Sequence, residues 1–187
     1  PGSDVMRTQF SSDDLRSIVQ QAHDGALPVA AHAHGVPAIE QSIEAEVDCI
    51  EHFSCLTDQG FAFSDELADR VAERDIAISC VIPPPLDMDL KELPPAIQKL
   101  AATTGLTPRQ AHEQRADMIG RLHARGVRVV VGIDAGLNPR MAHGNLPGRS
   151  GRRRGSARSW RSPAAPGRPS PRGSSARERP DPRSPGR

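Results

Sequence analysis

Two histidines and one aspartate follow three separate apolar runs of this chain, and together they could hold a metal ion. His32 ends the first run, His52 ends the second, and Asp134 follows the third, which covers 127–133. Imidazole nitrogens and carboxylate oxygens are the ligands that zinc and related ions take in open catalytic sites. Such an ion activates water, and Asp134 is the candidate base that moves the proton. A histidine at a strand end is also often a structural residue, so this alternative stays open.

The histidine next in sequence adds a further candidate. His34 follows His32 by two residues, so on a strand both side chains point to the same face. His34 is therefore an alternative ligand to His32. It could instead contact substrate or support the first ligand through a hydrogen bond.

Helical and strand patterns alternate along the chain and must position these side chains. The strand pattern covers 28–32, 48–52, 76–82 and 127–133, and helices are expected over 12–25, 37–47, 64–74, 94–103 and 107–126. The clearest helix start is Thr107-Pro108-Arg109-Gln110, where threonine caps, proline begins the helix and glutamine closes a capping box. Residues 53–63 are expected to form a loop, and no hairpin signal is present. The alternation predicts parallel strands, in a doubly wound sheet or in part of a (β/α)₈ barrel.

Charge divides the chain into two expected parts, a domain over 1–147 and a tail over 148–187. The tail contains 12 arginines, no lysine and 2 acidic residues. Of the 24 basic and 23 acidic residues in the whole chain, 12 and 21 then remain in the domain, a net charge of −9. An acidic domain disfavours nucleic acid as a partner. The tail is rich in Arg, Pro, Ser and Gly and poor in aliphatic residues, which predicts disorder. It could bind nucleic acid, be a solvated tail, or be the product of a reading-frame slip.

Other features exclude several classes of protein. The three cysteines form no CxxC pair, so we expect no disulfide scaffold and a reducing, cytoplasmic location. No run approaches 18 apolar residues, so no transmembrane helix and no membrane partner are expected. No GxGxxG or Walker A loop follows a predicted strand, which disfavours a doubly wound nucleotide-binding protein. The chain begins at Pro1 without an initiator methionine and is expected to be a fragment. Its oligomeric state is left open.

Several phrases, in their order and spacing, resemble the amidohydrolase superfamily, and within it the imidazolonepropionase-like and prolidase-like dipeptidase branch. They are Val29–Gly35, Asp48–His52, Val131–Gly136, His143-Gly144 and the helical lead-in Phe10–His23. The resemblance covers roughly residues 1–145. It implies an α/β fold that is a partial (β/α)₈ TIM barrel, made of strands five to eight with their helices.

The resemblance also implies a function and roles for single residues. The function is metal-dependent hydrolysis of carbon–nitrogen bonds in a small-molecule or peptide substrate, with zinc as the favoured divalent metal. His32 would be the ligand from strand five, His52 the ligand from strand six, and Asp134 the ligand from strand eight and the general base. His143 would lie in the loop after strand eight, where it either contacts substrate or is a solvated histidine.

The sequence also departs from the family pattern. The His-x-His pair of strand one and the carboxylated lysine of strand four are absent and would precede Pro1. Ile133 stands where the family usually has threonine, and the family pattern ends after Gly144. The chain is therefore expected to be an incomplete hydrolase. The alternative is a non-catalytic barrel remnant with an Arg-rich tail, which acts through binding.

Overall fold

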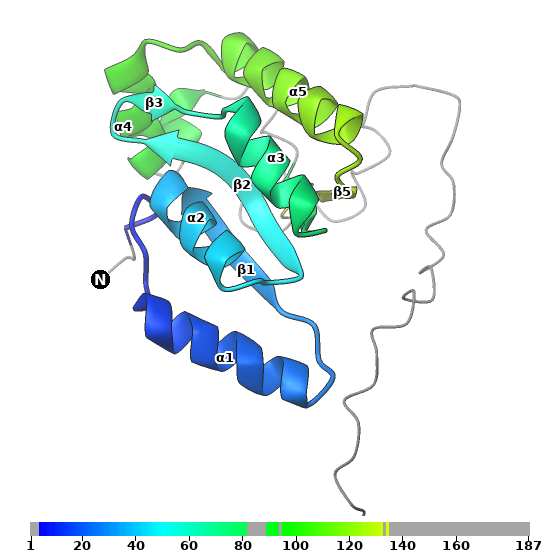
Figure 1. Ribbon diagram of the computed structural model, residues 1–187. Coiled ribbons are helices and arrows are strands. Elements are labelled where there is room, and N and C mark those ends of the chain that lie inside the picture. Colours follow the sequence, from blue (N-terminus) through cyan, green and yellow to red (C-terminus); the bar gives the residue numbers. More distant parts are fainter. Residues whose placement is uncertain (1–3, 82–88, 94, 133, 135–187) are drawn as a thin grey trace, which may run out of the picture. The chain divides into compact units, whose positions relative to one another are not determined.

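The computed structural model describes residues 4–81, 89–93, 95–132 and 134, which all lie in one compact unit, Pro1–Arg152. Helices and strands alternate along it (Figure 1). The elements are α1 Ser12–Asp24, β1 Ala30–Gly35, α2 Val36–Glu44, β2 Cys49–Thr57, β3 Gly60–Phe61, α3 Asp65–Glu73, β4 Ala77–Val81, the 3-10 turn η1 Leu90–Glu92, α4 Pro95–Thr104, α5 Pro108–Ala124 and β5 Val129–Gly132. The predicted tail over 148–187 lies outside the described residues.

The main strands are parallel and stand in the order β1-β2-β4-β5, which is their order along the chain. A doubly wound sheet reverses its strand order at a switch point, and this sheet does not. Ala31, Ile50, Ile78 and Val129 form one row across the four strands, and all four belong to or pack against a single hydrophobic core. The α/β alternation and the parallel sheet are therefore confirmed. The order is that of consecutive strands in a barrel.

The helices cover one face of this sheet with their apolar sides. Figure 1 shows α2 and α3 lying over the strands. Four helices contribute to the single core cluster, through Leu15, Val19, Ile39, Ile43, Leu67, Val71, Met118 and Leu122. Because the core lies on this side, the opposite face of the sheet is free to carry polar side chains.

The expected loop over 53–63 is wrong in part. Strand β2 continues to Thr57, and β3 pairs with it antiparallel through Leu56 and Phe61. Gly60 makes the tight connection with a backbone φ of 121°, a conformation open to glycine. The hairpin has no alternating pattern, because Cys55 and Leu56 are consecutive and both buried. For that reason no hairpin signal is visible in the residues before and after the turn.

Helix ends follow the capping signals of the sequence. Ser11 and Ser64 each accept a backbone N–H of the first turn, at 3.1 Å in both cases. Thr107 and Gln110 form the predicted capping box at the start of α5. Gly25 caps the end of α1. The local signals therefore locate the ends of these helices to within two residues.

The large hydrophobic side chains that stay exposed among the described residues lie near the two outer strands. Val130 and Val131 belong to β5, while Leu27 precedes β1 and Phe10 and Ile18 line a cavity beside it. The outer strands are thus the least covered part of the sheet. Within the described ranges, none of the helices combines the length and apolarity needed to cross a membrane.

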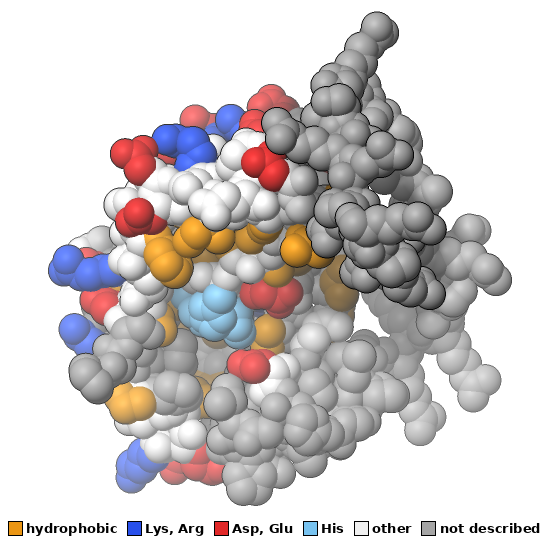
Figure 2. Space-filling view, turned by 90° about the horizontal axis from the view of Figure 1, so that it is seen from below, with side chains coloured by type: hydrophobic (Ala, Val, Ile, Leu, Met, Phe, Trp, Pro, Cys, Tyr) orange, Lys and Arg blue, Asp and Glu red, His pale blue; other side chains and the backbone are white. Residues whose placement is uncertain are grey.

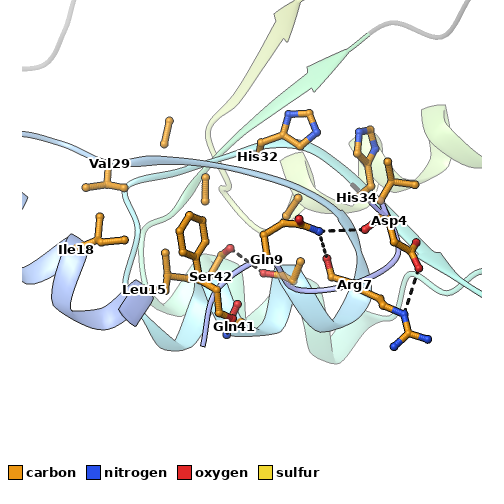
Figure 3. A pocket seen from close by; sticks show the side chains of 16 residues that line it. Asp4, Arg7, Gln9, Leu15, Ile18, Val29, His32, His34, Gln41 and Ser42 are labelled. Atoms are coloured by element: carbon orange, nitrogen blue, oxygen red, sulfur yellow. Dashed lines mark hydrogen bonds and ion pairs between the residues drawn. The ribbon is translucent and has the colours of Figure 1, made fainter. Parts of the chain in front are cut away.

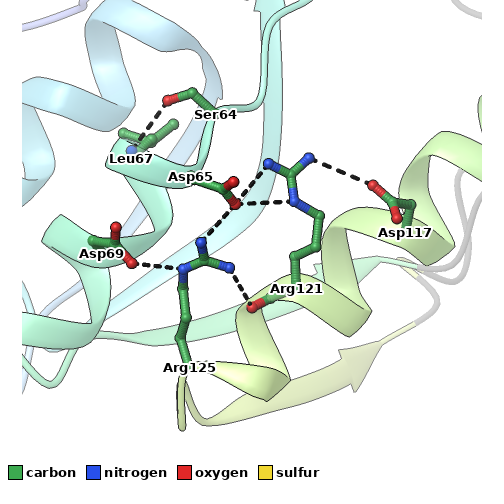
Figure 4. A network of polar contacts seen from close by, with 7 residues as sticks. All are labelled: Ser64, Asp65, Leu67, Asp69, Asp117, Arg121 and Arg125. Carbon is green, nitrogen blue, oxygen red and sulfur yellow. Dashed lines mark hydrogen bonds and ion pairs between the residues drawn. The ribbon is translucent and has the colours of Figure 1, made fainter.

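Ion pairs join α3 to α5 at the surface (Figure 4). Asp65 pairs with Arg121 at 2.7 Å and with Arg125 at 2.6 Å, and Arg125 also contacts Asp69 at 2.6 Å. Arg121 also lies over the ring of Phe63, 4.7 Å from its centroid. The hydrogen bond from Arg121, followed by the charges of both arginines, holds the pKa of Asp65 below its usual range. The network holds α3, which follows the β2–β3 hairpin, against α5, which precedes β5.

Replacing Gly35 should disturb the join between β1 and the N-terminal segment. A Cβ at Gly35 would lie 2.5 Å from the carbonyl oxygen of Met6, and backbone cannot rotate away as a side chain can. We expect Gly35→Ala to destabilise the fold by about 1–3 kcal/mol, measured by urea unfolding. The control is Gly120→Ala on α5, where nothing lies within 4 Å and the gain in helix propensity is about 1 kcal/mol. Equal midpoints for the two variants would contradict the close approach.

Removing the shared carboxylate of the surface network should lower the thermal midpoint in a salt-dependent and pH-dependent way. We expect Asp65→Asn to lose stability at low salt and to approach the wild type in 1 M salt, where screening acts over about 3 Å. A depressed carboxyl pKa stabilises above its unfolded value, 3.8, and this contribution is lost as the pH falls below it. Asp58→Asn, in the exposed β2–β3 turn, is the control. A deficit that persists in high salt would point to packing instead.

Candidate metal centre

Strand β1 presents two histidines on the face that the helices leave free. Ala33 is 2% exposed and belongs to the core, so its neighbours His32 and His34 point to the opposite face. The rings of these two histidines lie 4.8 Å apart, centroid to centroid. The prediction that they share a face is confirmed. The strand runs on to Gly35, so His32 lies inside the strand and not at its end.

Strand β2 brings a third histidine to the same place by leaving regular geometry. Its Glu51 stands opposite His32, and its His52 stands opposite Ala33. Strict alternation would therefore turn His52 toward the helices. Instead the backbone is left-handed at His52, with φ 68°, and at Phe53, with φ 47°. These two residues begin the stretch of β2 that turns the third ring toward the other two.

The register between the strands changes at this point. The pair Ala33–His52 is followed by the pair Gly35–Leu56, so β2 holds two more residues than β1 over the same length. Cys55 is also left-handed, with φ 50°. Such irregularities re-aim side chains next to functional sites.

The three imidazoles form one compact group. The ring centroids of His52 lie 4.3 Å from those of His32 and of His34, and one potential ligand atom of each residue lies within 4.8 Å of the others. Figure 2 shows histidine side chains gathered in a hollow on one face, with acidic side chains close by. The predicted convergence of the two strands is confirmed in its histidine part, and His34 joins the group.

This donor set fits a zinc-type ion. At Zn–N distances of about 2.0–2.1 Å, two nitrogens on one ion lie at most about 4.2 Å apart. Small inward rotations of the rings would therefore close the observed 4.8 Å spacing. Three nitrogen donors on one side also leave a coordination position open, as catalytic zinc sites do.

The electrostatics keep two of the rings uncharged at neutral pH. Burial, and then the charges of His52, His32 and Arg115, lower the pKa of His34 to about 4. Burial and His32 also lower the pKa of His52, while the carboxylate of Asp134 acts to raise it. Neutral imidazole is the form that binds a metal. His34 and His52 can thus bind a cation without first losing a proton.

A serine that the sequence did not indicate completes the surroundings of His34. The Nδ1 atom of His34 lies 2.9 Å from Oγ of Ser54. In the tautomer with its proton on Nδ1, His34 donates to Ser54 and leaves the Nε2 lone pair free. Metal-binding histidines commonly have such a partner on the second ring nitrogen. Ser54 escaped notice because it lies in the stretch predicted to be a loop.

Of the other predicted site residues, Asp134 and His143, the structure describes only Asp134. Asp134 is exposed, with a left-handed φ of 47°, and its carboxylate does not belong to the group whose ligand atoms lie within 4.8 Å of one another. Its charge nevertheless reaches His52. Its role as ligand and base stays a prediction. His143 lies outside the described residues.

A cavity opens beside two of the histidines (Figure 3). It has a volume of about 340 Å³ and is lined by β1, α1, α2 and the segments before α1 and β1. His32 and His34 stand along it on one side, while Leu15, Ile18 and Val29 supply apolar wall. Small-molecule sites of proteins have volumes of about 300–1,000 Å³. The apolar wall of the cavity lies on the helix side of β1, whereas the rings of His32 and His34 point to the other side (Figure 3).

Comparisons with known proteins agree with this arrangement. The Amidohydrolase family profile matches residues 3–153, most of the chain. No curated protein matches it significantly. Similar solved structures include a prolidase complexed with N-methylphosphonate-L-proline, at 24% identity, a TM-score of 0.53, and coverage of 72% of this chain and 30% of that one.

A second similar structure is A. niger ochratoxinase, at 22% identity and a TM-score of 0.51, over 71% of this chain and 27% of that one. These likenesses show the fold, a parallel α/β sheet of the barrel type. The chain spans less than a third of the length of either structure.

The depressed pKa of His34 should make stability depend on pH in the absence of metal. The unfolded ring takes its proton near pH 6.5, and the folded ring near 4. Unfolding therefore takes up a proton between these values, so stability is full above pH 6.5 and falls toward pH 4. We expect His34→Gln to flatten this slope in urea unfolding with a chelator present. An NMR titration of the His34 ring with a midpoint near 6.5 would contradict the depressed pKa.

Proposed function

The chain belongs to the amidohydrolase family, and from this premise we propose that it forms part of a metal-dependent hydrolase of carbon–nitrogen bonds. The observation that carries the proposal is the group of three imidazoles with ligand atoms within 4.8 Å of one another. Their number, the neutral state of His34 and His52, and the open side of the group suit a divalent ion. The nitrogen donors favour zinc.

His32, His34 and His52 would hold the ion, with Asp134 as a further ligand or as the base beside it. A bound divalent ion supplies Lewis acidity toward an amide carbonyl and toward water. The side chains of the protein would then contribute proton transfer. Asp134 would accept a proton from the attacking water and return it to the leaving nitrogen.

The proposed substrate is a small amide or a dipeptide. The prolidase of similar fold was crystallised with a phosphonate derivative of proline, and the sequence phrases resemble the same branch. We therefore propose the prolidase-like branch and a peptide or acylated amino acid as substrate.

We further propose that β1, β2, β4 and β5 are strands five to eight of a (β/α)₈ barrel. Their sequential parallel order and the short coverage of the similar structures support this assignment. Such a segment would hold only some of the metal ligands of the whole enzyme. A cytoplasmic location stays a prediction.

Substitutions at the histidines should separate metal binding from proton transfer. We expect the full chain to bind Zn²⁺ in calorimetry. His32→Asn, His34→Asn and His52→Asn should each weaken binding at least about tenfold, because each removes one donor. Asp134→Asn should reduce metal-dependent hydrolysis of dipeptides by about 10²–10⁴-fold and change metal affinity less.

The control for these substitutions is His123→Asn, at an exposed site near the end of α5, which should bind like the wild type. Zn²⁺ affinity that survives loss of His32 and of His52 would contradict the proposed centre. Zinc binding without hydrolysis of any dipeptide or acylated amino acid would favour the binding-only remnant instead.

A further inference from the structure

Helix α5 carries a partly buried cation, Arg115, on its apolar face. The pattern of that face predicts a hydrophobic side chain at this position. Arg115 stands three residues before Met118 and seven before Leu122, both fully buried, so it lies on the same helix face. Burial lowers the pKa of Arg115, although the nearby thiols of Cys80 and Cys55 act to raise it. No ion pair of Arg115 occurs within the described part of the chain. A partly buried arginine without an ion-pair partner in this part of the chain needs another reason for its position.

The contacts of Arg115 provide that reason. Its Nη1 donates to the carbonyl oxygen of Phe53 at 3.0 Å, and its Nη2 donates to the carbonyl oxygen of His52. These are the two consecutive left-handed residues of β2. The guanidinium therefore holds the backbone at the point where β2 leaves regular strand geometry.

The two carbonyls have lost the regular sheet pairing around them. The ladder between β2 and β4 ends at the pair Glu51–Ser79, and the ladder to β1 is interrupted after His52. Buried carbonyls need a donor. The planar fork of an arginine can serve two of them at once, which the ammonium of a lysine cannot do with the same geometry.

We propose that Arg115 is a positioning residue, whose bridge between the carbonyls of His52 and Phe53 holds the left-handed turn and so aims the His52 ring at His32 and His34. Arg115 acts through the backbone and is not a metal ligand. The inference rests on the proposed function for the metal, but the placement of the ring is a property of the metal-free chain. Nothing in the sequence near His52 shows this dependence, since the two residues stand 63 positions apart.

The test compares Arg115→Lys and Arg115→Met with Arg121→Lys in the full chain. Arg121 lies on the same helix, in the surface network, and does not touch β2. The first readout uses no metal: NMR contacts between the His52 ring and the His32 and His34 rings, with circular dichroism to verify folding. We expect Arg115→Lys to fold, to lose these contacts and to change the His52 ring shifts. Arg121→Lys should keep them.

The second readout is calorimetric titration with Co²⁺. We expect affinity to fall at least about tenfold in Arg115→Lys and to stay within about twofold of the wild type in Arg121→Lys. Folded Arg115→Lys that keeps the ring contacts would overturn the inference, whatever its metal affinity. A wild type that has the ring contacts but binds no Co²⁺ would refute the metal function and leave the positioning role standing. If Arg115→Met fails to fold, the ring contacts of Arg115→Lys alone test the positioning role.

Discussion

The structure depends on the point where β2 stops behaving as a regular strand. Left-handed backbone costs about 1–3 kcal/mol at each residue that is not glycine, and His52, Phe53 and Cys55 all adopt it. The stretch persists because Phe53 and Cys55 are fully buried, and burying a phenylalanine contributes about 1.5–3 kcal/mol. Arg115 adds two charge-assisted hydrogen bonds to the same backbone. Core packing and a partly buried cation together hold a turn that would otherwise relax.

This turn marks the limit of what could be predicted from the sequence. Alternation of helix and strand, the caps at Ser64 and Thr107, and the parallel sheet follow from local patterns of residues. The placement of His32 and His52 at neighbouring levels of two adjacent parallel strands also follows, but the direction of the His52 ring does not. The hairpin after β2 and the turn at His52 do not, since they arise from packing between distant segments. Arg115 gave one signal, a cation on an apolar helix stripe, but its partners could not be read from that stripe.

The same geometry explains why the three-histidine group comes from two adjacent strands. His32 and His34 come from regular alternation on β1, which needs no strain. His52 comes from a strained strand, and the strain places its ring within 4.3 Å of both others. Asp134 follows β5, at the far side of the sheet order, and its charge acts to raise the pKa of His52. This separation is compatible with the proposed roles, in which the three histidines bind a cation and Asp134 transfers protons.

X-ray absorption at the zinc edge, on the full chain loaded with one equivalent of Zn²⁺, tests this account most directly. It identifies the atoms bound to the metal. The account predicts only nitrogen and oxygen neighbours, at about 2.0–2.2 Å, with the outer scattering of three imidazole rings. Sulfur at about 2.3 Å, from any of the three cysteines, or a spectrum without imidazole scattering, would contradict a centre formed by His32, His34 and His52.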